Sequence, residues 1–183
     1  VTKPKDLVEE TAKLLKDYAI VGWYQGRMEF GPRALGNRSI LANPTKAEMK
    51  DIINQKVKFR ENFRPFAPMV PLEFVSEYFE TAGETPFMLN VVQVVPGKRK
   101  IIPAVTHVDD TARVQTVKPE QNALIYQLLH AMKKLNGVPV LLNTSFNIRG
   151  DTIVRTPQDA LHCFLTTGMN ALAIGPYLLI KKA

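Results

Sequence analysis

Residues 121–143 place an amphipathic helix directly before a continuous apolar run, and this pair of segments constrains the fold more than any other feature. Between residues 121 and 136, leucines and a methionine fall on one helical face, and Gly137 stands where a helix C-cap is expected. The apolar run at 138–143 is typical of a strand that is buried on both faces. A helix that leads into a buried strand predicts an α/β protein.

The rest of the chain alternates short helices with strands. Helices are predicted at 5–18, 46–56, 72–80 and 156–168, and strands at 19–24, 88–95, 111–117, 171–174 and 177–180. Thr45 and Glu48 fit a capping box for the second of these helices. Because several strands follow one another directly, we expect an α/β (α+β) fold with a mixed sheet, in a single domain over residues 1–183.

Composition indicates an ordinary globular protein. Of the 183 residues, 45% are hydrophobic and 22% are charged, which excludes a disordered or low-complexity chain. No segment is apolar enough to span a bilayer or to act as a signal peptide, so we expect a soluble, cytoplasmic protein. The single cysteine, Cys163, is expected to be a buried small hydrophobic residue. Because the chain begins at Val1 without a methionine, we expect it to be part of a longer polypeptide.

Positive charge concentrates in the segment 27–64, which contains two irregular loops and a helix. This segment holds nine basic and four acidic side chains, and nine minus four gives +5 of the chain's net +7. The helical lysines are explained by a solvated helix face. The loop arginines Arg33, Arg60 and Arg64 lie among glycines, prolines and aromatics, where we expect burial, and a buried guanidinium needs an anion such as phosphate. The alternative is that each arginine binds backbone carbonyls or one of the two loop glutamates.

Two further segments carry candidate ligand-binding groups. After the apolar run, Ser145 and Asn147 can both face a phosphate or ribose while Phe146 enters the core, and an ordinary turn is the alternative. Earlier in the chain, His107 precedes two aspartates and Arg113, a pattern that fits an anion or nucleotide site, a metal site or a structural histidine. The sequence has no P-loop, no dinucleotide-binding fingerprint and no motif for a covalent nucleophile.

Three segments together resemble one family, the carboxy-terminal domain of the O-carbamoyltransferases of the NodU and antibiotic-biosynthesis type. The segments are GRMEFGPRALGNRSIL at 26–41, KFRENFRPFAP at 58–68, and the pair 107–115 and 142–150. The likeness extends over nearly the whole chain, and the first segment is long and idiosyncratic. Asn43 and Asp110 stand where we expect Asp and Gly from the family pattern.

The resemblance implies a YrdC-like fold, a twisted mixed β-sheet flanked by helices, related to the enzymes that make threonylcarbamoyl adenylate for transfer RNA modification. Those enzymes bind ATP through a Lys-x-Arg and a Ser-x-Asn pair, which Lys58 with Arg60 and Ser145 with Asn147 match. In the carbamoyltransferases, as the resemblance implies, this domain forms carbamoyl adenylate and pyrophosphate from carbamoyl phosphate and ATP. A separate, metal-containing N-terminal domain of the actin-like ATPase superfamily, which we expect to be missing here, passes the carbamoyl group to a hydroxyl-bearing small molecule or glycan.

On this basis we expect the adenylate-forming half of a carbamoyltransferase. Lys58 and Arg60 would be catalytic residues that neutralise the triphosphate, and Lys58 is expected to carry charge rather than to support the core. The residues expected to bind substrate or nucleotide are Arg33, Arg64, His107, Arg113, Ser145, Asn147 and Arg149. Magnesium is expected to accompany ATP, and we assign it no protein ligand. The alternatives are an RNA-associated domain of the threonylcarbamoyl adenylate synthase kind and a catalytically inert interaction domain.

Overall fold

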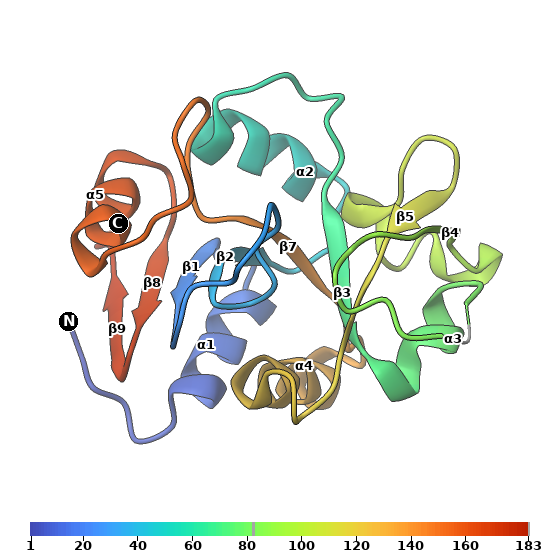
Figure 1. Cartoon of the computed structure of the whole chain (residues 1–183), viewed down its shortest axis with the longest axis horizontal. Helices are drawn as coiled ribbons and strands as arrows, with labels where there is room; N and C mark the ends of the chain where they lie inside the picture. Colours follow the sequence, from blue (N-terminus) through green and yellow to red (C-terminus); the bar gives the residue numbers. More distant parts are fainter. Residues whose placement is uncertain (82, 183) are drawn as a thin grey trace.

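The computed structural model describes residues 1–81 and 83–182, and its centre is a seven-stranded mixed sheet (Figure 1). In order across the sheet, the strands are β6 (Gln115–Val117), β3 (Ala67–Pro71), β7 (Leu141–Ser145), β2 (Arg38–Ala42), β1 (Val21–Tyr24), β8 (Ala171–Ile174) and β9 (Tyr177–Ile180). The pairs β1/β8 and β3/β6 are parallel, and the other neighbours are antiparallel. A separate antiparallel ribbon joins β4 (Val91–Gln93) to β5 (Thr111–Arg113).

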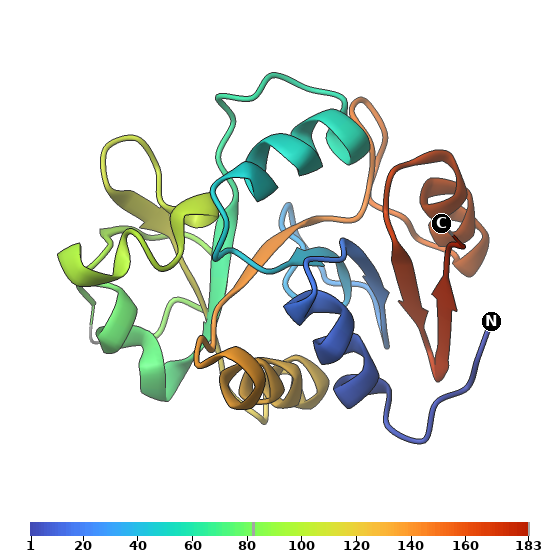
Figure 2. The same ribbon diagram turned by 180° about the vertical axis from the view of Figure 1, so that it is seen from behind.

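Helices cover both faces of this sheet. They are α1 (Leu7–Lys16), α2 (Glu48–Ile53), α3 (Val75–Tyr78), α4 (Ala123–Asn136) and α5 (Pro157–Thr166), with 3₁₀ turns at Leu72–Phe74, Pro96–Lys98 and Pro103–Val105. Helices α1 and α4 lie side by side on one face, as both views show (Figures 1 and 2), and α2 and α5 pack on the other. Successive strand residues face opposite sides of the sheet. Leu141 therefore packs into the core on the side of α1 and α4, and Leu142 into the core on the side of α2 and α5. In the part of the chain that is described, no helix is long and apolar enough to cross a membrane.

The structure confirms the α/β fold and most of the predicted elements. The two C-terminal strands occupy the predicted residues, and Gly137 caps α4 with a φ of +79°. Helix α5 begins on a capping box, in which the Thr156 hydroxyl accepts from the backbone N–H of Asp159 at 3.1 Å and the Asp159 carboxylate accepts from that of Thr156 at 3.0 Å.

Three predictions about local structure are corrected. Thr45 does not cap α2, because its hydroxyl donates to Asn43 Oδ1 at 2.9 Å and the helix begins at Glu48. The strand predicted at 111–117 is two strands, one in the ribbon and one in the main sheet. Strands β2 and β3 include residues that the glycine- and proline-rich sequence predicts as irregular. Both strands pair with β7, and this tertiary pairing overrides the local signals.

Candidate active site

Lys58 reaches the interior through an unusual helix end. After α2, residues Asn54–Lys58 form one π-helical turn, and Phe59 ends it in the left-handed region with a φ of +49°. Such turns often occur at functional sites, and a bulky residue at positive φ is strained. The turn places Lys58 inside the protein, where only 3% of its surface is exposed.

The Lys58 ammonium joins the two sequence motifs. Nζ donates to the backbone carbonyls of Ser145 at 2.5 Å and Asn147 at 3.0 Å and to Asn147 Oδ1 at 2.9 Å, and Ser145 Oγ lies 3.3 Å away. Ser145 Oγ donates in turn to Asn147 Oδ1 at 2.6 Å. Phe146, between the two, is fully buried, as the sequence predicts. The Lys-x-Arg and Ser-x-Asn pairs therefore meet in space.

Burial changes the ionisation and the structural role of Lys58. Burial, together with the nearby Arg60 guanidinium, lowers the pKa of Lys58 to about 7. The four oxygens around Nζ are all uncharged. The expectation that Lys58 carries charge rather than core is corrected, because the side chain is buried and holds the loop after β7 in place.

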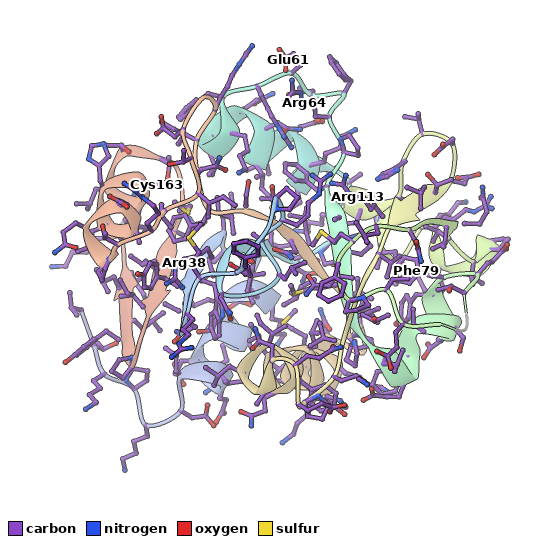
Figure 3. The ribbon with its side chains drawn as sticks, in the orientation of Figure 1. Arg38, Glu61, Arg64, Phe79, Arg113 and Cys163 are labelled. Carbon is purple, nitrogen blue, oxygen red and sulfur yellow. The ribbon has the colours of Figure 1, made fainter. Side chains whose placement is uncertain are left out.

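Two adjoining cavities gather most of the predicted site residues. The smaller, of about 130 Å³, is lined by residues that include Arg33, Arg60, Arg113, Asn143 and Ser145. The larger, of about 260 Å³, is lined by residues that include Arg60, Arg64, His107 and Arg113. We call these two cavities and the adjoining Lys58 the basic site; Figure 3 labels Arg64 and Arg113 within it.

The arginines of the basic site repel one another. Arg33, Arg60 and Arg113 form no ion pair with any carboxylate in residues 1–81 and 83–182. Burial and then the neighbouring Arg33 lower the pKa of Arg113, and burial and then Arg64 lower the pKa of Arg60. Asn54 Oδ1 accepts from Arg60 Nε at 2.8 Å and fixes its direction. Because like charges gathered in this way are stabilised by an opposite charge, the geometry favours an anionic ligand.

Burial does not extend to every predicted arginine. Arg33 is exposed, and Arg64 keeps 52% of its side-chain surface exposed while its Nε lies 3.4 Å from a Glu61 carboxylate oxygen. Arg149 is also exposed and lies 3.3 Å from the same carboxylate. The alternative interpretation, an arginine held by a loop glutamate, therefore applies to Arg64. Figure 3 shows Glu61 and Arg64 together at the edge of the molecule.

The loop that carries Arg33 is held by hydrogen bonds between charged side chains and the loop backbone. Glu29 Oε1 accepts hydrogen bonds from the backbone N–H groups of Leu35 and Asn37, each at 2.7 Å. Arg38 is 4% exposed and donates to three backbone carbonyls of the loop. These hydrogen bonds hold the loop without using Arg33. Its guanidinium therefore stays exposed at the surface of the basic site.

His107 lies at the edge of the larger cavity. It is half-buried, its Nδ1 is 3.1 Å from Thr111 Oγ1, and burial is the main cause that lowers the pKa of His107. Nearby Asp110 has a φ of +64°, which explains why a glycine suits this position. Within the described residues, no group of three or more His, Cys, Asp or Glu side chains is placed to hold a metal ion.

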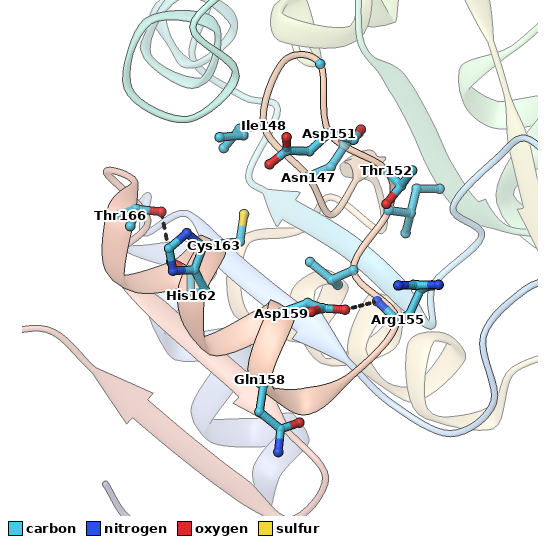
Figure 4. A pocket seen from close by; sticks show the side chains of 13 residues that line it. Asn147, Ile148, Asp151, Thr152, Arg155, Gln158, Asp159, His162, Cys163 and Thr166 are labelled. Atoms are coloured by element: carbon cyan, nitrogen blue, oxygen red, sulfur yellow. Dashed lines mark hydrogen bonds between the residues drawn. The ribbon is translucent and has the colours of Figure 1, made fainter.

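A separate cavity of about 520 Å³ lies between the loop after β7 and helix α5 (Figure 4). Asn147, His162 and Cys163 are among its lining residues. Cys163 is buried, as predicted, and burial raises the pKa of its thiol to about 11. A thiol that stays protonated is a poor nucleophile, so this cavity does not suggest cysteine catalysis.

Asn143 is a buried polar residue of the smaller cavity that was not predicted from the sequence. It is 1% exposed in β7 and lines the smaller cavity. A polar residue that closes a continuous apolar run is the signal that points to it, because buried polar groups are normally retained for a specific contact.

The sequence matches one known protein family over most of its length. The family described as "Carbamoyltransferase C-terminus" matches residues 12–181. The chain belongs to this family. Nodulation protein NolO of Bradyrhizobium diazoefficiens is 47% identical over 185 residues, covering 100% of the chain and 34% of NolO. The 3'-hydroxymethylcephem-O-carbamoyltransferase of Amycolatopsis lactamdurans is 38% identical over 167 residues, covering 91% of the chain and 32% of that enzyme. This carbamoyltransferase C-terminal domain therefore spans about a third of either relative.

Solved structures confirm the YrdC-like fold of this C-terminal domain. Full-length HypF in a phosphate- and nucleotide-bound form aligns with a TM-score of 0.61 at 18% identity, covering 93% of this chain and 21% of HypF. A variant of P. abyssi Sua5 aligns with a TM-score of 0.61 at 14% identity, covering 86% of this chain and 45% of Sua5. At such identities the likeness defines the fold and leaves the chemistry to the residues of the site.

Proposed function

We propose that this domain activates a carbamoyl group by converting carbamoyl phosphate and ATP into carbamoyl adenylate, phosphate and pyrophosphate. The observation that carries the proposal is the basic site, where Lys58 and unpaired arginines gather around two adjoining cavities. Both substrates and the leaving group carry phosphate, which guanidinium groups bind bidentately. The name of the cephem O-carbamoyltransferase and the nucleotide-bound state of HypF support this choice.

The proposed reaction has two steps. Water first releases phosphate from carbamoyl phosphate and leaves carbamate. A carbamate oxygen then attacks the α-phosphorus of ATP, a new O–P bond forms, and pyrophosphate leaves with the electrons of the broken P–O bond. Chemistry of this kind needs positioning and charge stabilisation rather than a covalent nucleophile.

The position of each side chain in the basic site suggests its role in this reaction. Lys58 and Arg60 would neutralise the triphosphate and the charge that develops at the α-phosphate. Ser145 and Asn147 would hold phosphate oxygens when Lys58 turns toward the nucleotide. The remaining groups proposed to contact carbamoyl phosphate or the nucleotide are Arg33, Arg64, His107, Arg113 and Arg149. Magnesium would be carried by the ATP oxygens, because the ammonium and guanidinium groups of the site disfavour a cation that the nucleotide does not bring with it.

We further propose that another domain of a longer chain completes the transfer to a hydroxyl-bearing small molecule or glycan. The chain spans about a third of its relatives, which leaves room for such a domain in those proteins. Phe30, Phe63 and Phe87 are 108%, 79% and 60% exposed, on segments whose neighbouring residues line the two cavities of the basic site. Large apolar side chains in such positions are suited to contact another protein surface.

The direct test is the release of phosphate and pyrophosphate by the chain in the presence of ATP, with and without carbamoyl phosphate. We expect equal amounts of both products, and pyrophosphate only when both substrates are present. Pyrophosphate release at the same rate with and without carbamoyl phosphate would contradict the proposal. If neither substrate raised the melting temperature, an inert interaction domain would be favoured, and RNA affinity that falls steeply with salt would favour an RNA-associated domain.

A further inference from the structure

Asn143 is a buried polar residue in the middle of the sheet. It lies in β7, between β2 and β3, and it is 1% exposed. It also forms part of the wall of the smaller cavity, together with Arg33, Arg113 and Ser145. A side chain in this position can contact a small ligand that the arginines hold.

A hydrogen-bond network fixes which way the Asn143 amide points. Asn143 Nδ2 donates to the backbone carbonyl of Ala34 at 2.9 Å and to Gln115 Oε1 at 2.9 Å. Gln115 Nε2 donates in turn to the backbone carbonyl of Leu35 at 2.9 Å. Because backbone carbonyls only accept hydrogen bonds, both amides are oriented without ambiguity.

This orientation leaves one acceptor unused. Asn143 Oδ1 is buried and has no hydrogen-bond partner among the residues that the structure describes. Arg113 Nε, on another wall of the same cavity, is likewise a buried donor with no partner within the described ranges. A buried acceptor is unfavourable unless a ligand or water supplies a donor, so the cavity is suited to a ligand with an N–H group and a carbonyl oxygen.

We propose that Asn143 Oδ1 accepts a hydrogen bond from the NH₂ group of carbamoyl phosphate and so selects a carbamoyl group over an acyl group. The inference rests on the proposed function, because the arginines must hold the phosphate of the same ligand. The carbamoyl carbonyl accepts from Arg113 Nε. Acetyl phosphate has the same phosphate and carbonyl, but it places a methyl group against Oδ1 and leaves that oxygen unpaired.

The first test changes the ligand and leaves the protein intact. Calorimetric titration of the chain should give an affinity for carbamoyl phosphate about threefold to tenfold higher than for acetyl phosphate, the range of one neutral hydrogen bond. Equal affinities would overturn the role of Asn143 while leaving the proposed function standing. Failure to bind either compound, or inorganic phosphate, would overturn both.

The second test compares two asparagines that hold the same loop. Asn143→Ala should bring the ratio of the two affinities to about one and leave the affinity for inorganic phosphate within about twofold, because the lost contact is to the NH₂ group. Asn122→Ala is the matched control, since Asn122 Nδ2 binds the Gly36 carbonyl but does not line the smaller cavity. We expect Asn122→Ala to keep the parent ratio. An unchanged ratio in Asn143→Ala, or an equal loss in Asn122→Ala, would overturn a direct contact.

Discussion

The Nζ atom of Lys58 lies 2.9 Å from Oδ1 of Asn147, so a lysine at the end of a helix is bound by a motif 89 residues further along the chain. This contact makes Lys58 both a structural and a chemical residue. Its partners are uncharged, so the ammonium can turn to a phosphate without breaking an ion pair. Both roles can be tested by replacing Lys58.

Lys58→Ala should abolish carbamoyl phosphate-dependent pyrophosphate release and also lower the free energy of unfolding by roughly 1–3 kcal/mol, because Asn147 Oδ1 and the backbone carbonyls of Ser145 and Asn147 lose the hydrogen bonds that Nζ donates. Urea denaturation and a pyrophosphate assay measure the two effects. Lys56→Ala is the matched control, because Lys56 is exposed two residues earlier and should change neither. An unchanged unfolding free energy in Lys58→Ala would show that its contacts do not support the fold.

Anion affinity should fall as the pH rises through about 7, where Lys58 loses its proton. A bound anion favours the protonated amine, so affinity is full below this pKa and declines above it. Sulfate is a suitable probe because it does not titrate between about pH 6 and about pH 9, and a decline of up to about tenfold is expected. The same titration with Lys58→Met should be nearly flat. A parallel decline in that variant would assign the titration to another group.

Arg33→Ala should weaken pyrophosphate binding by about 1.5–3 kcal/mol, the range for a hydrogen bond to a charged group. Arg27→Ala removes the same charge from an exposed position of the same loop, outside the two cavities, and should have little effect. Isothermal titration calorimetry of the two variants measures their pyrophosphate affinities. It separates the effect of the position of the arginine from the effect of the lost charge. Equal losses would mean that the site attracts anions only through the charge of the whole loop.

Gly22→Ala should disturb the site indirectly, by displacing Phe146. A Cβ at Gly22 would lie 2.7 Å from Cζ of Phe146, the residue between Ser145 and Asn147. We expect a loss of about 1–3 kcal/mol in stability from overpacking, together with slower pyrophosphate release. At Gly97 a Cβ meets no described atom within 4 Å, so Gly97→Ala is the control. Normal activity in a destabilised Gly22→Ala variant would show that the motif tolerates movement of Phe146.

The sequence predicts the site well where the chemistry is local. Ser145, Phe146 and Asn147 alternate polar, apolar and polar at the end of a strand, and this alternation alone places both polar groups on one side. Helix α5 and the two C-terminal strands can be predicted equally well, because a capping residue marks the start of the helix and apolar runs mark the strands.

The remaining features depend on contacts between distant parts of the chain. The burial of Lys58 depends on a π-helical turn, which has no local sequence signal, and on the contacts of Lys58 with the distant loop after β7. The exposure of Arg33 follows from Glu29 and Arg38, which use their charges on backbone groups of the loop. The free acceptor of Asn143 becomes visible only when Ala34 and Gln115 are brought against it.

In the proposed reaction, the basic site makes the α-phosphate of ATP reactive toward carbamate. Exchange of labelled pyrophosphate into ATP measures the reverse of that step in the isolated chain. We predict exchange that requires carbamoyl phosphate and is lost in Lys58→Ala. Exchange that proceeds without carbamoyl phosphate, or that persists in Lys58→Ala, would contradict this mechanism.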